Sequence, residues 1–233
     1  MLANRSIAVI IPALNEEQAI RHVLQDLPAF IDQIIVVDNG STDRTALVAK
    51  QSGAQVIAES RRGYGSACLA GISVCNCDIV AFIDGDYSDY PQDLQLLVSA
   101  VVTKQADLSI GSRISAFCSE GAMLWHQRAG NWFMCCLISV LHGAQFSDLG
   151  PMRCIEMATL RKLNMVDKDY GWTTEMQIKA SQQQLAIKEI PVRYRTRIGT
   201  SKISGTLKGT LLAAYKITYW TIKLFISKPH RAT

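Results

Sequence analysis

The first half of the chain alternates short apolar runs with amphipathic segments, and this alternation restricts the fold more than any other feature of the sequence. Strands are predicted at 6–12, 33–38, 54–58, 78–84 and 107–111. Helices are predicted between them at 15–27, 43–52 and 65–75, and after Pro91. Strands that are apolar along almost their whole length are typical of a parallel sheet covered on both faces. We therefore expect an α/β, Rossmann-like, mostly parallel sheet with helices on both faces.

The second half of the chain is less regular. Its predicted elements are helices at 122–142, 173–184 and 206–227 and a strand at 186–195. A chain of 233 residues that is 48% hydrophobic is long enough to bury one substantial core. We expect one domain over 1–204 and an appended helical segment over 205–233. No secretory signal is expected, and the seven irregularly spaced cysteines are interpreted as reduced cytosolic thiols.

Charge is distributed unevenly along the chain. Residues 1–187 carry 14 Lys and Arg against 19 Asp and Glu, whereas residues 188–233 carry 10 against 1. A basic C-terminal segment indicates a partner with phosphate groups, which the composition alone leaves open as nucleic acid, an anionic membrane surface or a phosphorylated substrate.

Two aspartates follow the fourth predicted strand in the stretch FIDGDYSDYPQDL. Asp84 and Asp86 flank one glycine, and residues two apart in an extended chain point the same way. Such a pair suits a hard divalent cation, Mg²⁺ or Mn²⁺, which is often shared with substrate phosphates. The alternative is that both residues cap the next turn, but their place after a buried strand favours the cation. Asp89 and Asp93 are predicted to be helix-start charges.

Other polar residues follow neighbouring predicted strands. Asn15 and Glu16 come after the first strand, Asp38 ends the second, and Asp84 ends the fourth. Ligands of parallel sheets bind beyond the carboxyl ends of the strands, so these side chains are expected to converge on one crevice. Asn15 is also expected to cap the first helix.

Seven short motifs carry a resemblance to a known family. VIIPALNEE (9–17), VVDNGSTDRT (36–45), FIDGDYSDYP (82–91) and GSR (111–113) resemble the successive motifs of family-two inverting glycosyltransferases with the GT-A fold. DLGPMR (148–153), YGWTTEMQIKA (170–180) and IPVRYRTRIGTSKISGT (190–206) are similar to those of dolichyl- and polyprenyl-phosphate sugar synthases. The resemblance runs from about residue 6 to residue 206, and it implies a GT-A catalytic domain over 1–204.

The resemblance implies a role for each matching residue. The nucleotide base and ribose would be held by Pro12, Leu14, Asn15, Glu16 and Asp38. Asp84 and Asp86 would bind the metal ion and the nucleotide-sugar, and Arg113 would lie near the pyrophosphate and the acceptor phosphate. Ser88 stands where relatives often carry a glutamine, so a third protein ligand for the metal is not expected from the motif.

A glycine-rich loop, RRGYGSACLAG (61–71), comes before the third predicted helix. Gly63 and Gly65 with two arginines at a helix start are typical of an anion cradle, and the resemblance favours nucleotide contact there. The alternative is an ordinary glycine turn.

The activity that the resemblance implies is metal-dependent, inverting transfer of a sugar from a UDP- or GDP-sugar to a polyprenyl or dolichyl phosphate. Asp86 and Arg113 would be catalytic, since they would stabilise the charge of the departing diphosphate. An acceptor phosphate is already anionic and needs cations to hold it. The candidates are Arg128, Arg195, Arg197 and Lys202.

A hydroxyl acceptor, soluble or on another lipid, would instead need a general base. Asp148 and Glu175 are then the catalytic candidates, and the alternative is that each makes a structural hydrogen bond. A distant alternative is a non-catalytic module that binds nucleic acid, but the sequence lacks a recognition-helix pattern or a basic sheet with interleaved aromatics. We therefore expect no nucleic-acid partner.

The last predicted helix is apolar but interrupted by lysines. Lys208, Lys216 and Lys223 fall within an arc of about 80° at 100° per residue, and the stretches between them are too short to span a bilayer. One interpretation is a helix that lies on the cytoplasmic leaflet, with its lysines toward lipid phosphates and with Tyr215, Tyr219 and Trp220 at the headgroups. The other is a helix packed on the protein itself. The apolar segment 132–141 either joins the membrane surface or belongs to the core.

Overall fold

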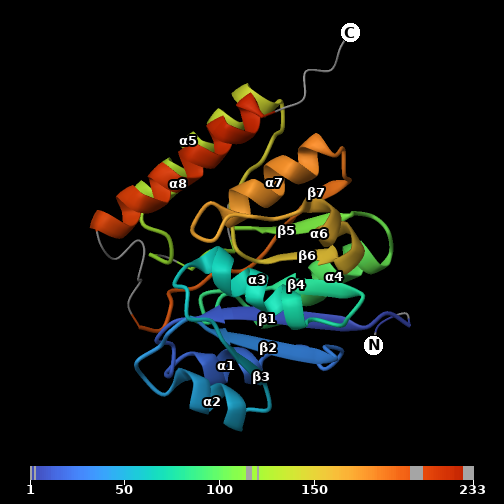
Figure 1. Ribbon diagram of the computed structural model, residues 1–233, viewed down its shortest axis with the longest axis vertical. Coiled ribbons are helices and arrows are strands. Elements are labelled where there is room, and N and C mark those ends of the chain that lie inside the picture. Colours follow the sequence, from blue (N-terminus) through green and yellow to red (C-terminus); the bar gives the residue numbers. More distant parts are fainter. Residues whose placement is uncertain (1, 3, 114–116, 120, 200–206, 228–233) are drawn as a thin grey trace.

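A twisted sheet with helices on both faces forms the body of the protein in the computed structural model, which describes residues 2, 4–113, 117–119, 121–199 and 207–227 (Figure 1). The strands are β1 (Ile7–Ala13), β2 (Gln33–Asp38), β3 (Gln55–Ala58), β4 (Ile79–Phe82), β5 (Leu108–Ser112), β6 (Arg153–Glu156) and β7 (Ile187–Pro191). The α-helices are α1 (Ile20–Gln25), α2 (Thr45–Gln51), α3 (Tyr64–Val74), α4 (Leu94–Val102), α5 (Trp125–His142), α6 (Met157–Leu163), α7 (Trp172–Gln182) and α8 (Leu207–Ile226). A 3₁₀ turn at Pro91–Asp93 precedes α4.

The strand order is β3-β2-β1-β4-β6-β5-β7. Only β6 runs against its neighbours, β4 and β5, and all other pairs are parallel. The predicted α/β, mostly parallel sheet is therefore confirmed. The carboxyl ends of β1, β2 and β4 meet at one edge, where the chain places its acidic motifs.

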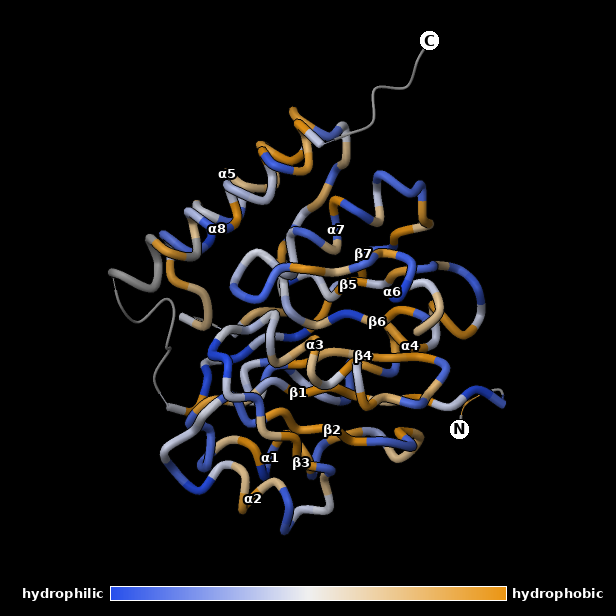
Figure 2. Tube along the Cα trace, viewed as in Figure 1, coloured by the Kyte–Doolittle hydropathy of each residue, from blue (hydrophilic) through white to orange (hydrophobic). Residues whose placement is uncertain are grey.

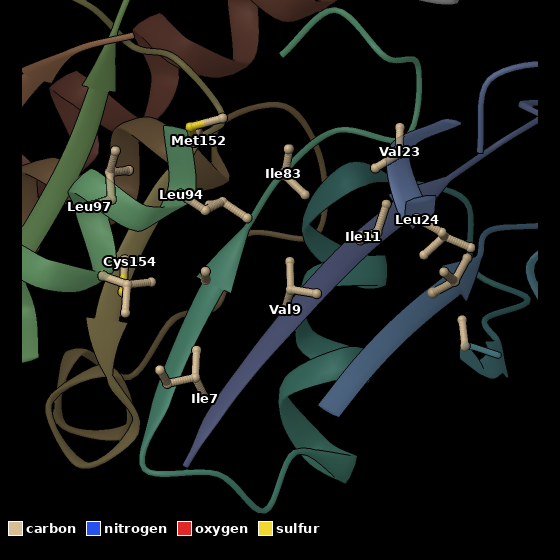
Figure 3. Close-up of a cluster of buried hydrophobic side chains, with 14 of the residues drawn as sticks. Ile7, Val9, Ile11, Val23, Leu24, Ile83, Leu94, Leu97, Met152 and Cys154 are labelled. Carbon is tan, nitrogen blue, oxygen red and sulfur yellow. The ribbon is translucent and has the colours of Figure 1, made fainter. Parts of the chain in front are cut away.

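Both faces of the sheet are covered because its central strand is apolar throughout. Ile7, Val9 and Ile11 of β1 pack with residues of α1, α2 and α4 on one face, and Figure 3 shows this cluster. Ala8 and Ile10, which alternate with them, pack on the opposite face with α3, α6 and α7. In Figure 2 the hydrophobic colour accordingly follows β1, β2 and β4.

The C-terminal helix lies along α5 and packs on α7 (Figure 1). Trp220 and Leu224 are buried in a third cluster with Ile138 of α5 and Ile178 of α7. Of the two interpretations of this segment, packing on the protein is therefore correct for its inner face. No helix in the described part of the chain is long and apolar enough to cross a bilayer. The predicted boundary between 1–204 and 205–233 lies outside the described residues and stays a prediction.

Candidate active site

A cavity of about 420 Å³ opens beyond the carboxyl ends of β1 and β4. We call it the first cavity. Eight predicted site residues line it together: Pro12, Leu14, Asn15, Glu16, Gly63, Asp84, Asp86 and Arg197. The lining residues that were not among the predicted site residues are Ala13, Asn39, Arg62, Tyr64, Ala67, Gly85 and Tyr170. The convergence expected from the parallel sheet is thus present, although its members differ in part.

The two carboxylates of the D-G-D motif have different surroundings. Asp84 Oδ1 is enclosed and has no hydrogen-bond partner among the described residues. In contrast, Asp86 Oδ1 accepts hydrogen bonds from Ser88 N at 2.9 Å and Ser88 Oγ at 2.6 Å, and its Oδ2 pairs with Arg197 Nη2 at 2.8 Å. Burial and the charge of Asp86 raise the pKa of Asp84 to about 7. Ser88, which differs from the glutamine of many relatives, therefore orients Asp86.

Asp89 belongs to this acidic cluster, and its prediction as a helix-start charge is wrong. The residue is 1% exposed, and neither carboxylate oxygen accepts a hydrogen bond from any part of the chain that the structure describes. Burial and the charges of Asp84 and Asp86 raise its pKa well above the ordinary value. The signal that reasoning from sequence missed is the spacing, since the turn after Asp86 brings Asp89 back toward both acids. Asp93 does lie at the helix start, where it pairs with Arg193 at 2.6 Å.

The residues at this cluster fit a divalent cation. Asp84 offers an enclosed oxygen that no described residue binds, and a cation would offset both the burial and the repulsion from Asp86 that raise its pKa. Within the described ranges, no three His, Cys, Asp or Glu side chains are grouped so that they could hold a metal ion. A cation on Asp84 and Asp86 would therefore complete its shell with substrate oxygens and water, as Mg²⁺ commonly does.

Asn39, and not Asp38, faces the first cavity. Asp38 Oδ1 instead accepts a hydrogen bond from the Ser41 amide at 3.0 Å. Asn39 Oδ1 accepts from the Gly63 amide at 2.7 Å, and its Nδ2 donates to the Arg61 carbonyl at 2.7 Å. The predicted role of Asp38 is therefore not matched by its position, and the neighbouring asparagine shapes the cavity wall.

Asn15 lines the cavity but does not cap a helix, because α1 begins only at Ile20. Its backbone is left-handed, with φ of 55°, a conformation that asparagine tolerates better than most residues. Its Oδ1 accepts a hydrogen bond from the Thr42 amide at 2.8 Å, which joins the loop after β1 to the loop after β2.

The glycine-rich loop packs against another loop and does not present free amides to an anion. The Gly65 amide donates to the Asp169 carbonyl at 3.1 Å, and the Ser66 amide donates to the Lys168 carbonyl at 2.9 Å. A Cβ on Gly65 would lie 2.2 Å from the Asp167 carbonyl oxygen. The predicted anion cradle is therefore wrong for Gly65, which permits close loop packing, whereas Gly63 and Arg62 do line the cavity.

A second cavity, of about 750 Å³, lies between α5, Arg113 and residues 145–147. Arg128 lines it and makes no ion pair with any described residue. Arg113 also lines it, but its guanidinium is held by Asp148 through Nε–Oδ2 and Nη2–Oδ1 distances of 2.7 and 2.8 Å. Within the described part of the chain, the second cavity thus offers one cation without an ion pair, Arg128, beside apolar and thiol side chains.

Neither predicted general base is free to take a proton. The Arg113 charge and its hydrogen bonds outweigh burial and hold the pKa of Asp148 below its ordinary value. Glu175 is fully buried, accepts hydrogen bonds from the amides of Val166 and Asp167, and pairs with Lys179 at 2.6 Å. Both carboxylates therefore make structural hydrogen bonds and ion pairs, which was the alternative to a role as general base.

The four predicted phosphate ligands have different outcomes. Arg128 lines the second cavity, and Arg197 lines the first and pairs with Asp86. Arg195 lines neither, because its Nε and Nη2 donate to the carbonyls of Tyr87 and Asp89. Its prediction as a phosphate ligand is therefore wrong. Lys202 lies outside the described residues.

The charge of Arg113 acts on both cavities. Its side chain lines the second cavity, and its charge lowers the pKa of Asp84 in the first, although burial and Asp86 have larger opposite effects. A group that acts on both sites is positioned to influence a transfer between them.

The helices beside the second cavity expose many apolar side chains. Four of them on α5 are Trp125, Trp132, Phe133 and Val140, and four on α8 are Tyr215, Tyr219, Ile222 and Ile226, while Leu212 and Phe225 of α8 are exposed beside them. We call the two sets of four the apolar surface. The α8 members fall within an arc of about 60°, opposite the side that packs on α5 and α7. In segment 132–141, Ile138 therefore belongs to the core, whereas Trp132, Phe133 and Val140 are exposed, and their contact with a membrane stays a prediction.

The lysines of α8 do not point away from the protein as expected. Lys216 pairs with Asp169 at 2.9 Å, and Lys223 Nζ lies 4.4 Å from the centre of the Trp220 ring. Trp220 itself is 5% exposed and donates a hydrogen bond to Asp167, so its predicted headgroup position is wrong. The side chain of Lys208 lies outside the described part.

The fold resembles that of solved sugar-transferring enzymes. Glucosyl-3-phosphoglycerate synthase from Mycobacterium tuberculosis, solved with Mn²⁺, uridine diphosphate and phosphoglyceric acid, matches with a TM-score of 0.76 and 24% identity over 98% of this chain and 81% of that one. The same synthase solved with Mg²⁺ and uridine diphosphate matches with a TM-score of 0.75. The fold is GT-A, and with the family evidence below it defines the protein as a glycosyltransferase.

The chain belongs to glycosyl transferase family 2, whose sequence model matches residues 8–167. An uncharacterized glycosyltransferase of Mycobacterium bovis is 37% identical over 222 residues, which cover 95% of this chain and 99% of the relative. A dolichyl-phosphate hexose transferase of Haloferax volcanii is 31% identical over 84% of this chain and 86% of its own length.

Proposed function

We propose that the protein transfers a sugar from a UDP- or GDP-sugar to a polyprenyl or dolichyl phosphate, with inversion and with Mg²⁺ or Mn²⁺. The observation that carries this proposal is a pair of cavities, one lined by Asp84 and Asp86 and the other by Arg128, which makes no ion pair with any described residue. The similarity to a dolichyl-phosphate hexose transferase supports a lipid phosphate as the acceptor.

The first cavity is the proposed donor site. Asp84 and Asp86 would hold the divalent cation, which when bound neutralises charge on the diphosphate as the sugar departs. Arg197 supplies a further positive charge in the same cavity, and its pairing with Asp86 leaves it close to where a diphosphate would lie. Asn39 and Gly63 fix the wall against which the nucleoside would rest.

The second cavity is the proposed acceptor site. Arg128 would bind the acceptor phosphate, whose oxygen attacks the anomeric carbon on the face opposite the diphosphate. A phosphate needs no general base, and this matches the commitment of Asp148 and Glu175 to structural contacts. Those contacts disfavour a hydroxyl acceptor, which was the alternative.

The apolar surface of α5 and α8 would rest on the cytoplasmic face of a membrane. Trp132 lines the second cavity and is also 68% exposed, so the cavity and the apolar surface are continuous at this residue. A prenyl chain could therefore stay in the lipid while its phosphate reaches Arg128. Aromatic rings suit the bilayer interface, and an exposed group of apolar side chains is typical of a docking surface.

A donor and acceptor screen tests the proposal. UDP- and GDP-sugars are offered with and without polyprenyl phosphate, with Mn²⁺ or EDTA, and released nucleoside diphosphate is followed. Arg128→Gln should raise the KM for polyprenyl phosphate by roughly tenfold or more and leave the donor KM unchanged, since a charged hydrogen bond contributes about 1.5–3 kcal/mol. Arg161→Gln, at an exposed position on α6, is the matched control.

Two outcomes would contradict the proposal. In the first, release of nucleoside diphosphate does not depend on polyprenyl phosphate but increases with a soluble alcohol. The acceptor would then be a hydroxyl group and not a lipid phosphate. In the second, the protein is fully active in EDTA, and this would contradict the assignment of a divalent cation to Asp84 and Asp86.

A further inference from the structure

The loop that carries the site acids is bound along its backbone by two residues distant in the sequence, chiefly by Arg195. We call residues 84–89 the acid loop. Four successive carbonyls, those of residues 86–89, accept hydrogen bonds from the segment after β7. Ile198 N donates to the Asp86 carbonyl at 3.0 Å, and Arg195 supplies the other three donors. Arg195 donates from N to Ser88 at 2.9 Å, from Nε to Tyr87 at 2.7 Å and from Nη2 to Asp89 at 3.2 Å.

The guanidinium of Arg195 is also held between two rings of the same loop region. Its Cζ lies 3.3 Å from the centre of the Tyr87 ring and 4.1 Å from that of Tyr90. Arg195 Nη2 also lies 4.0 Å from Asp26 Oδ2, and no other carboxylate of the described residues pairs with the guanidinium. Arginine combines a flat face for stacking with donors along its edge, and lysine cannot reproduce this combination.

These contacts hold a backbone conformation that tyrosine rarely adopts. Tyr87 has φ of 64°, which is left-handed and unfavourable for a bulky side chain. Tyr87 has a second side-chain contact in addition to Arg195: its hydroxyl donates a hydrogen bond to Asp26 Oδ2 at 2.6 Å. The left-handed turn at Tyr87 places Ser88 where its amide and hydroxyl bind Asp86 Oδ1. The orientation of Asp86 therefore depends on the turn that Arg195 secures.

We propose that Arg195 is a positioning residue: it fixes the left-handed turn of the acid loop, so that Asp86 is oriented for a divalent cation and the donor diphosphate. Arg195 itself touches neither the cavity nor the reacting groups. The consequence for cation affinity rests on the proposed function, whereas the fixing of the loop does not.

The test compares Arg195→Met and Arg195→Lys with Arg193→Met. Arg193 is the matched control because it lies two residues away, also stacks on Tyr90 at 4.4 Å and also pairs with an aspartate of this region, Asp93. Amide hydrogen exchange of residues 86–89 is measured without any cation. Mn²⁺ binding is measured by electron paramagnetic resonance with UDP or GDP present, and thermal unfolding is recorded for every variant.

Arg195→Met should speed exchange at Tyr87 and Ser88 by at least tenfold and weaken Mn²⁺ binding by at least tenfold. Arg195→Lys should show the same changes in smaller degree, and it keeps the test valid if the methionine variant does not fold. Arg193→Met should leave both quantities within twofold, even if its unfolding temperature falls equally. Equal effects of the two positions, or unchanged exchange in the Arg195 variants, would overturn the inference. If the parent protein does not bind Mn²⁺, the cation site of the proposed function is wrong. The hydrogen-exchange data would still decide whether Arg195 fixes the loop.

Discussion

Among single residues, Asp84 links cation binding to pH. Its pKa is raised to about 7 by burial and by Asp86, and a metal ligand must be deprotonated. We expect the apparent affinity for Mn²⁺ to be constant above pH 8 and to fall by about tenfold per pH unit below 7, as protons compete for the carboxylate. Calorimetric titrations between pH 5.5 and 8.5 check this, and an affinity that does not change across that range would contradict it.

The same residue should also lower the stability of the cation-free protein. Its folded-state pKa lies above the ordinary value of 3.8, so between these pH values the folded state binds more protons than the unfolded chain. The contribution of Asp84 to the free energy of unfolding therefore decreases as pH rises from about 4 to 7. Asp84→Asn should raise the unfolding temperature at pH 8 and abolish transfer.

Asp78 provides the opposite case for the same measurement. Hydrogen bonds from Ser6 lower its pKa, so its ionised form is favoured in the folded state. Asp78→Asn should not raise the unfolding temperature at pH 8. If both variants change stability in the same direction, the assignment of opposite environments is wrong.

The sequence predicted which strand ends contribute to the first cavity, but it did not predict which side chain of a loop faces the cavity. Pro12, Leu14, Glu16 and Asp84 line the first cavity as expected, because parallel strands end at one edge. Asp38 was predicted to face the cavity, but Asn39 does so instead. The chain turns immediately after β2, and the spacing of motifs does not show which of two adjacent polar side chains faces inward. Arg195 was misplaced for a similar reason, since its carbonyl partners lie more than 100 residues away.

Among the elements, α8 combines a packed face and an exposed face, and these should respond differently to substitution. Ile222→Glu and Ile226→Glu should weaken binding to vesicles that contain anionic lipid and leave the unfolding temperature nearly unchanged, because both side chains are exposed. Flotation of the protein with such vesicles measures this. Leu47→Glu, at an exposed position on α2, is the control and should not change flotation.

Trp220 tests the inner face of the same helix. Trp220→Ala should destabilise the protein by about 3–5 kcal/mol, since it empties the cluster between α5, α7 and α8. Loss of vesicle binding in this variant alone, without loss of stability, would contradict the assignment of Trp220 to the core.

The elements themselves were predictable because their periodicity is strong. β1, β2, β4 and β5 appear within two residues of their predicted bounds, as expected for apolar runs between turns. β6 and α6 were not predicted, because β6 has only four residues, RCIE, of which two are charged. Its place in the middle of the sheet depends on tertiary pairing with β4 and β5 and on burial of Arg153, which donates to the carbonyls of Gly150 and Thr173.

At the scale of the whole molecule, the loop 167–169 joins α8 to the first cavity. Its backbone carbonyls bind the first amides of α3, and its side chains bind Trp220 and Lys216 of α8. Tyr170, the next residue, lines the cavity. A substitution on α8 that weakens its contacts with this loop should therefore weaken nucleotide binding in the first cavity.

Lys216→Met tests this connection. Loss of its ion pair with Asp169 should weaken nucleotide binding by roughly two- to fivefold, which corresponds to a partly exposed ion pair of about 0.5–1 kcal/mol. Lys223→Met is the control on the same helix, since Lys223 Nζ lies over the rings of Tyr219 and Trp220 and makes no ion pair with a described residue of the loop. Calorimetry with UDP or GDP and Mn²⁺ measures both, and equal affinities in the two variants would show that the loop does not transmit the change.

The outward aromatic and aliphatic residues of α5 and α8 also govern how separate copies behave in aqueous buffer. Without lipid, such surfaces lower their contact with water by touching one another, so concentrated samples should scatter light increasingly as ionic strength rises. Mild non-ionic detergent should restore uniform particles without altering the unfolding temperature, because it would occupy a face that the folded chain leaves uncovered.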